Sequence, residues 1–219
     1  MIILKIYYIF LLLFFSKSVF AIKPAPWVGV DFKGVPCKGG SNVYGPYDYT
    51  LPAHKGKYAI VERHHFSKNV EFLIKGDTSM DLTQDINYTL VTLPNHHKAL
   101  LSVLRYQIRL NKKIAKLPLR VPVECYFQRA INFSPKDAAT YSLYAYYLRK
   151  INLLDKAREK YIKAIDIAPD SQKIKYSYAL LLIDMKKYEQ ALEIAKSLYV
   201  NKNLPNGLKQ QLIKLGVWE

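Results

Sequence analysis

The 219-residue chain is half hydrophobic and contains 18 Tyr and 9 Phe, which excludes the disordered class and allows a buried core. Its formal net charge of +16 makes anionic partners the first to consider. The excess is local: residues 27–95 carry seven basic and seven acidic side chains, whereas residues 96–136 carry nine basic side chains and one acidic side chain, Glu124.

The N-terminal segment, 1–21, has the three parts of a secretory signal peptide. Lys5 gives a positive start, residues 6–15 are apolar without interruption, and Val19 and Ala21 occupy the small-residue positions before a cleavage site. An uncleaved membrane anchor is the alternative, but Lys17 interrupts the run well short of the roughly 20 apolar residues that a span needs. The sequence therefore predicts cleavage after Ala21 and a periplasmic or secreted protein.

Residues 22–95 are expected to form an irregular N-terminal arm with one short helix. The first part of this arm is rich in Pro and Gly, which mark turns. Residues 57–66 fit a strand or extended segment. Ser67 is then a candidate N-cap for a helix over residues 68–75, which Gly76 closes.

Two cysteines, Cys37 and Cys125, remain after removal of the signal peptide. In an oxidising compartment an even number of cysteines favours a disulfide. The alternative is a pair of free thiols. We expect the bridge, because closing a long loop gives a large stabilisation in the chain-entropy model.

Four histidines come in two adjacent pairs: His64, His65, His96 and His97. If the two segments met, these imidazoles could bind a metal ion, and with Glu62 or Glu124 they would suggest a metal-dependent or histidine-assisted enzyme. Neighbouring residues on a helix diverge by roughly 100°, however, and no H-E-x-x-H motif is present. We therefore expect capping and packing histidines, with no metal, no cofactor and no catalytic residue, and keep the enzyme as an alternative.

Asn95 is expected to cap a basic amphipathic helix that ends before Pro118. Five basic residues recur at spacings of 7, 4, 3 and 4, which places them on one face: Lys98, Arg105, Arg109, Lys112 and Lys116. Such a stripe suits acidic protein, phosphate or anionic lipid, whereas few aromatic residues interleave with it, which disfavours nucleic acid. We predict that Arg105, Arg109 and Lys112 bind a partner. Weak peripheral membrane contact through residues 98–116 and a merely solvated face are the alternatives.

Residues 138–171 and 172–204 repeat each other at an offset of 34 positions. Ala145 matches Ala179, and Ala157 matches Ala191. This offset, with small residues at the eighth and twentieth places, is the spacing of the tetratricopeptide repeat, and the two units closely resemble that family. The small residues allow the two helices of a pair to approach closely.

The flanking segments extend this pattern. Three residues fall on repeat places 24, 27 and 32: Phe127, Ala130 and Pro135. Residues 96–137 are therefore predicted to form a degenerate helix pair with a long loop over 111–122, and residues 205–219 a capping helix closed by Gly216. The expected fold is mainly α, a tetratricopeptide-like helical solenoid with two clear repeats and one degenerate repeat behind the irregular arm.

The resemblance implies a scaffold for protein–protein interaction. On its concave face we expect eight partner-binding residues: Ser142, Tyr146, Arg149, Lys150, Lys173, Tyr176, Leu180 and Asp184. They depart from the basic, Asn-rich clamp that chaperone-binding members use for terminal carboxylates. Short stretches at residues 45–49, 62–66, 87–90, 94–97 and 123–127 also resemble exported repeat proteins of Gram-negative bacteria. We therefore predict a non-enzymatic envelope adaptor for a protein partner, which the basic charge suggests is acidic.

Overall fold

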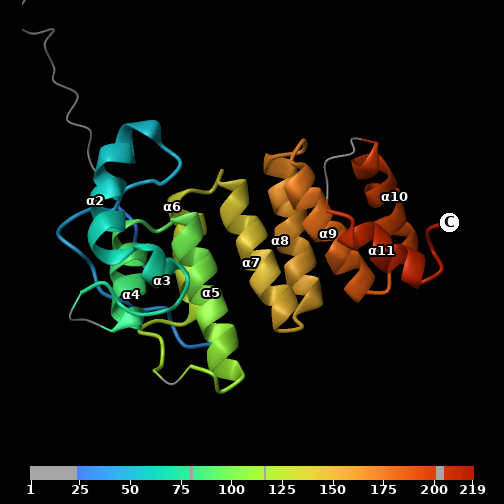
Figure 1. Cartoon of the computed structure of the whole chain (residues 1–219). Helices are drawn as coiled ribbons and strands as arrows, with labels where there is room; N and C mark the ends of the chain where they lie inside the picture. Colours follow the sequence, from blue (N-terminus) through green and yellow to red (C-terminus); the bar gives the residue numbers. More distant parts are fainter. Residues whose placement is uncertain (1–23, 79–80, 116, 201–204) are drawn as a thin grey trace, which may run out of the picture.

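The computed structural model describes residues 24–78, 81–115, 117–200 and 205–219 (Figure 1). The expected signal peptide over residues 1–21 lies outside these residues. The described chain is helical and contains no β-strand, which confirms the prediction of a mainly α protein. Within the same residues, no helix has the length and apolar character needed to cross a membrane.

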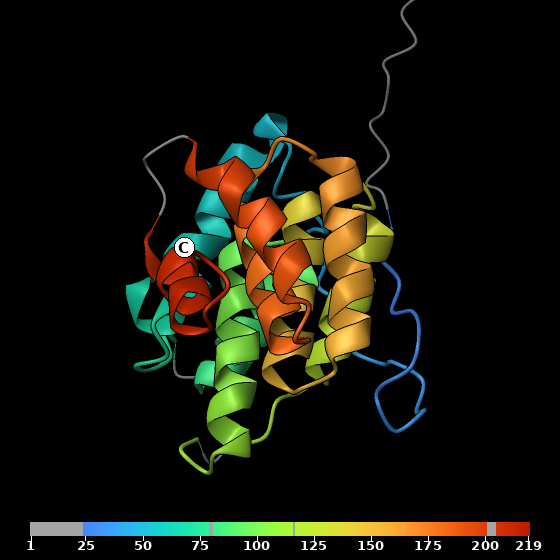
Figure 2. The ribbon, with the colours of Figure 1, turned by 90° about the vertical axis from the view of Figure 1, so that its right-hand side faces the viewer.

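The helices are arranged in space broadly in their chain order, from one end of the molecule to the other (Figure 1). The described elements are η1 (Pro52–His54), α2 (Lys55–His65), α3 (Lys68–Glu71), α4 (Leu82–Thr92), α5 (His97–Asn111), α6 (Val123–Phe133), α7 (Ala138–Lys150), α8 (Leu154–Ile167), α9 (Gln172–Asp184), α10 (Tyr188–Tyr199) and α11 (Gly207–Lys214). Each helix from α7 to α10 packs against the next one in the chain, and α5 packs on α4, α6 and α7. Figure 2 looks along this series of helices from the α10 and α11 end, so that the earlier helices lie behind.

The expected N-terminal arm is irregular only as far as Leu51. The prediction of a strand or extended segment over residues 57–66 is wrong, because these residues belong to α2. The more buried positions of α2, near Tyr58, Val61 and His65, recur at helical spacing, and the helix packs against α4. The apolar residues Ala59 and Ile60 of α2 are exposed, which hides this period in the sequence.

Ser67 caps α3 as expected, since its side chain accepts a hydrogen bond from the Asn69 N–H. The helix ends at Glu71, however, and does not reach the predicted end at residue 75. Helix α4 (Leu82–Thr92) has no counterpart among the helices predicted from the sequence. Asp81 caps it by accepting hydrogen bonds from the backbone N–H groups of the second and third helical residues.

The offset of the sequence repeat recurs in the helix boundaries. Ala138 and Gln172, which begin α7 and α9, are separated by this offset, as are Leu154 and Tyr188, which begin α8 and α10. The small residues of the repeat are fully buried where these helices pack together: Ala145, Ala157, Ala179 and Ala191. Substituting them with larger residues would force the paired helices apart.

Two kinds of helix ending alternate along the chain. After α3, α5, α7, α9 and α11 a residue with positive φ donates to the carbonyl three residues back, and the next N–H donates to the carbonyl five residues back; the positive-φ residues are Leu73, Lys113, Asn152, Lys186 and Gly216. This is the Schellman ending of a helix. After α4, α6 and α8 the chain instead turns through one hydrogen bond, from His96 to Leu93, Asp137 to Ser134 and Ser171 to Ala168.

The alternation of endings begins earlier in the chain than the repeat that is visible in the sequence. The ending of α3 is like those of α5 and α7, and the ending of α4 is like those of α6 and α8. Both α3 and α4 lie inside the segment that was expected to be the irregular arm. Gly216 closes α11 as predicted, with a φ of 67°.

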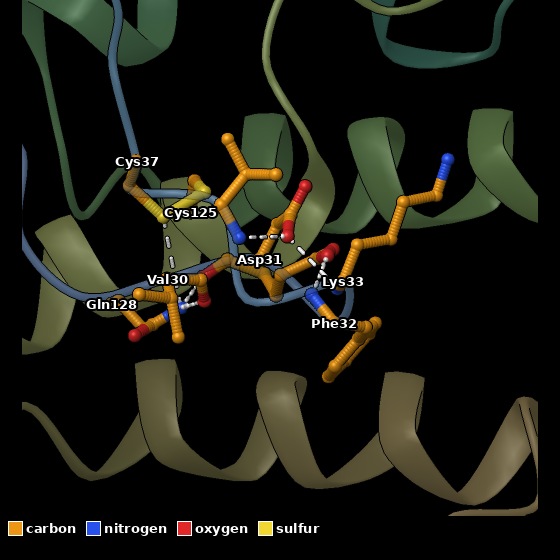
Figure 3. Close-up of a disulfide and its surroundings, with 9 residues drawn as sticks. Val30, Asp31, Phe32, Lys33, Cys37, Cys125 and Gln128 are labelled. Carbon is orange, nitrogen blue, oxygen red and sulfur yellow. Dashed lines mark hydrogen bonds between the residues drawn. A yellow bond between two sulfur atoms is a disulfide. The ribbon is translucent and has the colours of Figure 1, made fainter.

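Residues 24–51 form the remaining arm, which is attached to α6. Cys37 and Cys125 form a disulfide, as predicted (Figure 3). Beside it, the Glu124 carboxylate accepts a hydrogen bond from the Phe32 N–H at 2.8 Å, and the Gln128 side-chain amide donates to the Val30 carbonyl at 2.8 Å. One turn of α6 thus holds the arm covalently and through two hydrogen bonds.

Arg129, also on α6, attaches the arm a second time, and its side chain is almost fully buried. Its guanidinium donates hydrogen bonds to three carbonyls, those of Ala25 in the arm and of Leu90 and Val91 near the end of α4. It also lies over the ring of Trp27, 4.8 Å from its centroid. Arg129 therefore joins the arm, α4 and α6.

Candidate functional site

A groove runs across the first turns of α5, α7 and α9. Its volume is about 410 Å³, and its lining comes from these three helices and from the turn before α9: His97, Lys98, Leu101, Ala138, Ala139, Ser142, Leu143, Ala168, Ser171, Lys173 and Ile174. A volume of several hundred Å³ matches the size of known ligand sites. The three helices lie side by side because α7 packs on both α5 and α9.

The groove is apolar inside and positively charged at its edges. Leu101, Leu143 and Ile174 give it apolar walls, each at least half-buried. Lys98 on α5 and Lys173 on α9 are exposed at the two sides. The N-terminal ends of helices carry partial positive charge, so the backbone adds to the potential of the two lysines. The arrangement suits a ligand with an apolar group and a negative charge.

Two of the eight residues predicted on the concave face lie in this groove, Ser142 and Lys173. Arg149 and Asp184 lie instead at the opposite ends of α7 and α9, where the Arg149 Nε is 2.6 Å from the Asp184 carboxylate. Lys150 lies over the ring of Tyr146, 5.4 Å from its centroid. These four residues connect neighbouring helices or lie near the ends of α7 and α9, away from the groove.

Tyr176 and Leu180 do not line the groove either. The Tyr176 hydroxyl accepts a hydrogen bond from the Leu208 N–H at 3.2 Å, so this tyrosine holds α11 against α9. Leu180 is half-buried and packs against the core. The sequence pattern could not anticipate this, because it does not show where α11 folds back.

The basic residues of α5 have separate environments. Arg105 and Lys112 are exposed, and Arg109 donates a hydrogen bond from Nη1 to the Leu73 carbonyl at 3.1 Å. Lys98 lies on the same helix, at the N-terminal end of the predicted stripe, and lines the groove. Lys116, the fifth member of the predicted stripe, lies outside the described residues.

The two histidine segments meet, but the imidazoles turn to different carboxylates. The ring of His96 packs against that of Phe66, with centroids 4.9 Å apart. Three histidine–carboxylate contacts follow: His65 with Asp85 at 2.9 Å, His96 with Glu62 at 3.0 Å, and His97 with Asp137 at 2.8 Å. His64 is exposed. Within the described residues, no group of three or more His, Cys, Asp or Glu side chains is arranged to hold a metal ion.

His96 is the N-cap of α5, a role that was expected for Asn95. The His96 Nδ1 accepts a hydrogen bond from the Ala99 N–H at 3.1 Å, so the proton of the neutral ring is on Nε2, which donates to Glu62. Asn95 instead accepts a hydrogen bond from the Tyr49 N–H at 2.9 Å. Both residues therefore join the N-terminal region to the start of α5.

The electrostatics of this contact favour a neutral imidazole beside a carboxylate. Burial lowers the pKa of His96 below its usual range, even though Glu62 acts in the opposite direction. The hydrogen bond from His96 lowers the pKa of Glu62. For Asp137, burial raises the pKa, but the hydrogen bonds from His97, Thr140 and Asn95 outweigh it and lower the pKa overall.

The groove residues that sequence reasoning missed share one signal. They stand in the first turns of their helices, at spacings of three or four residues, as with Lys98 and Leu101 or Ala139 and Leu143. That signal identifies one face of each helix but not which faces meet. In the comparisons with known proteins, no family model matches the chain and no curated protein matches it.

Proposed function

We propose that the chain is an exported, non-enzymatic scaffold of the tetratricopeptide-repeat type, which holds a segment of a protein partner. The observation that carries this proposal is the groove of about 410 Å³ with its apolar walls between Lys98 and Lys173. The alternating helix endings and the regular offset between equivalent helices support the relationship to helical repeats. The Cys37–Cys125 disulfide is typical of proteins in an oxidising compartment and supports export.

The chemistry of the groove defines the partner segment. An apolar side chain of the partner would displace water from Leu101, Leu143 and Ile174, and this burial would supply most of the affinity. Acidic residues on either side of it would face Lys98 and Lys173, which would fix the direction of the segment and accelerate association. We therefore propose an acidic segment with a central apolar residue.

The test is quantitative affinity purification from the cell envelope of the host. Lys98→Glu/Lys173→Glu reverses the charge at both edges of the groove, and we expect it to deplete the partner at least about tenfold. The matched control, Lys163→Glu/Lys196→Glu, changes the net charge equally at exposed positions of α8 and α10. It should recover the partner at the wild-type level.

A second variant tests the apolar part of the groove without changing its charge. Ser142→Trp places a large side chain where the partner is expected to lie, at a half-buried position. Circular-dichroism melting shows whether each variant is folded. If folded Lys98→Glu/Lys173→Glu and Ser142→Trp both capture the same proteins in the same amounts as the wild type, the groove is not the binding site.

A further inference from the structure

Three large apolar side chains are exposed together beside the C-terminal half of α5. Phe72, Ile74 and Ile114 are 53%, 68% and 67% exposed. Arg109 connects their two segments, because its Nη1 donates to the Leu73 carbonyl at 3.1 Å while its own carbonyl accepts from the Ile114 N–H at 2.8 Å. Figure 1 shows α3 next to α5, and the two helices pack on each other.

The exposure of Ile74 and Ile114 is unusual for their place in the fold. Each follows a positive-φ residue in a Schellman ending, a position whose apolar side chain commonly packs back onto the helix. At the same position after α7, Leu153 packs against the core. The equivalent residues after α3 and α5 instead face solvent, which favours a role in contact with another molecule.

Five exposed cations lie on the same two segments as these apolar side chains or on the C-terminal half of α5: Lys75, Arg105, Arg109, Lys112 and Lys113. We call these five residues, together with Phe72, Ile74 and Ile114, the Ile74 patch. The sequence contains no Asp or Glu from His96 to Val123. The nearby carboxylates have other partners: Glu71 pairs with Lys68 at 2.9 Å, Asp81 pairs with Arg120 at 3.5 Å, and Asp77 accepts a hydrogen bond from the Ser67 N–H at 2.7 Å. Among the described residues, no ion pair compensates the five cations.

We propose that the Ile74 patch docks the protein on a lipid bilayer with anionic head groups. Such a surface accepts both components of the patch, because apolar side chains enter the region between head groups and acyl chains while cations remain among the phosphates. A single-stranded nucleic acid would instead need several stacking rings, and Phe72 is the one aromatic residue of the patch. A duplex would offer phosphates to the cations but no apolar surface to Ile74 and Ile114. The patch shares no residue with the groove, so this inference does not depend on the partner-binding role.

The electrostatic component is tested by co-sedimentation of the mature chain with vesicles of phosphatidylglycerol and phosphatidylcholine, and with vesicles of phosphatidylcholine alone. We expect binding to the anionic vesicles only. Lys75→Glu/Arg105→Glu/Lys112→Glu should weaken the partition coefficient at least about a hundredfold. The control, Lys136→Glu/Lys163→Glu/Lys196→Glu, has the same net charge at exposed positions elsewhere and should weaken it much less.

The apolar component is tested with Ile74→Ser/Ile114→Ser. This variant should weaken binding at least about tenfold, and high salt should remove the remainder, because only screened charge interactions are left. The control, Val43→Ser/Val200→Ser, removes two side chains that are even more exposed, at 106% and 78%, and should bind like the wild type.

The proposal is overturned if the wild type binds neither vesicle or both equally, or if the folded patch variants bind as their controls do. Loss of a protein partner from the charge-reversed patch, without any vesicle binding, would show instead that the patch is a protein interface. Thermal melting of each variant separates lost binding from lost folding. Failure here would leave the groove experiment unaffected, since that experiment alters other residues.

Discussion

Asn152 and Lys186 occupy equivalent places in the two repeats and adopt the same left-handed backbone conformation, with φ of 61° and 59°. Each donates its N–H to the carbonyl three residues back and so closes a first helix of a pair, α7 or α9. The conformation costs a lysine roughly 1 kcal/mol, whereas glycine adopts it freely. The turn is therefore imposed on the chain by the packing of consecutive helices.

We predict that Lys186→Gly stabilises the protein by about 0.5–1 kcal/mol, because the strain at this turn is relieved. Lys187→Gly is the matched control, since Lys187 has a φ of −93° and gains nothing from glycine. Urea unfolding measures both. A lower midpoint for Lys186→Gly than for the wild type would contradict the assignment of this turn.

Reduction of the disulfide should destabilise the protein by about 4 kcal/mol, because the bridge joins residues 88 positions apart and restricts the unfolded chain. The measurement is urea unfolding with and without a reductant. Cys37→Ser/Cys125→Ser should unfold at the midpoint of the reduced wild type and should not respond to the reductant. Coinciding midpoints for oxidised and reduced wild type would show that the bridge does not constrain folding.

Arg129→Ala should cost about 3 kcal/mol, because three carbonyls lose a charged donor in a buried place. The control is Arg120→Ala, which removes an exposed ion pair with Asp81 and should change stability by less than about 1 kcal/mol. Limited proteolysis gives a second readout. Because Arg129 holds the carbonyl of Ala25, its loss should speed cleavage within the arm ahead of global unfolding.

Stability should fall as the pH is lowered through the range below about 6.5, because His96 is buried as a neutral cap. Its folded pKa is lowered, so the unfolded chain binds more protons in this range and mild acid favours unfolding. Glu62 acts in the same direction at lower pH, since its lowered pKa gives stability that is lost as the pH falls below about 4.5.

His96→Asn provides the test, because asparagine is a good N-cap that does not titrate. The unfolding free energy of this variant should change less between pH 7.5 and pH 5.5 than that of the wild type. These two pH values lie about one unit above and below the ordinary pKa of histidine. His64→Asn, at an exposed position, should keep the wild-type pH dependence. Identical slopes for the wild type and His96→Asn would show that this imidazole does not control acid stability.

The sequence predicted the second half of the fold well, for a physical reason. Fully buried small residues such as Ala145 and Ala157 are needed wherever two helices approach closely, so their spacing is visible in the chain. The disulfide was predictable from two cysteines and a suspected compartment. The helix over residues 57–66 was not, since Val61 is the one fully buried residue of α2 and leaves almost no period to detect.

The site was harder to predict than the fold. Lys98 and Lys173 are far apart in the sequence, and only the stacking of α5, α7 and α9 places them on the two sides of one groove. Of the residues predicted from the sequence to face a partner, Ser142 and Lys173 lie in this groove. It could not exclude Tyr176, because the contact with Leu208 depends on how α11 packs against α9.

Position-specific photocrosslinking in the host tests most directly whether the groove binds a protein partner. A small diazirine side chain at Ser142, which leaves the groove open, is compared with one at Ser197, exposed on α10. We predict one discrete protein adduct from position 142, none of it from position 197, and its loss when Lys98→Glu/Lys173→Glu is added. The same adducts from both positions, or adducts at 142 that persist in the charge-reversed chain, would contradict a binding groove between α5, α7 and α9.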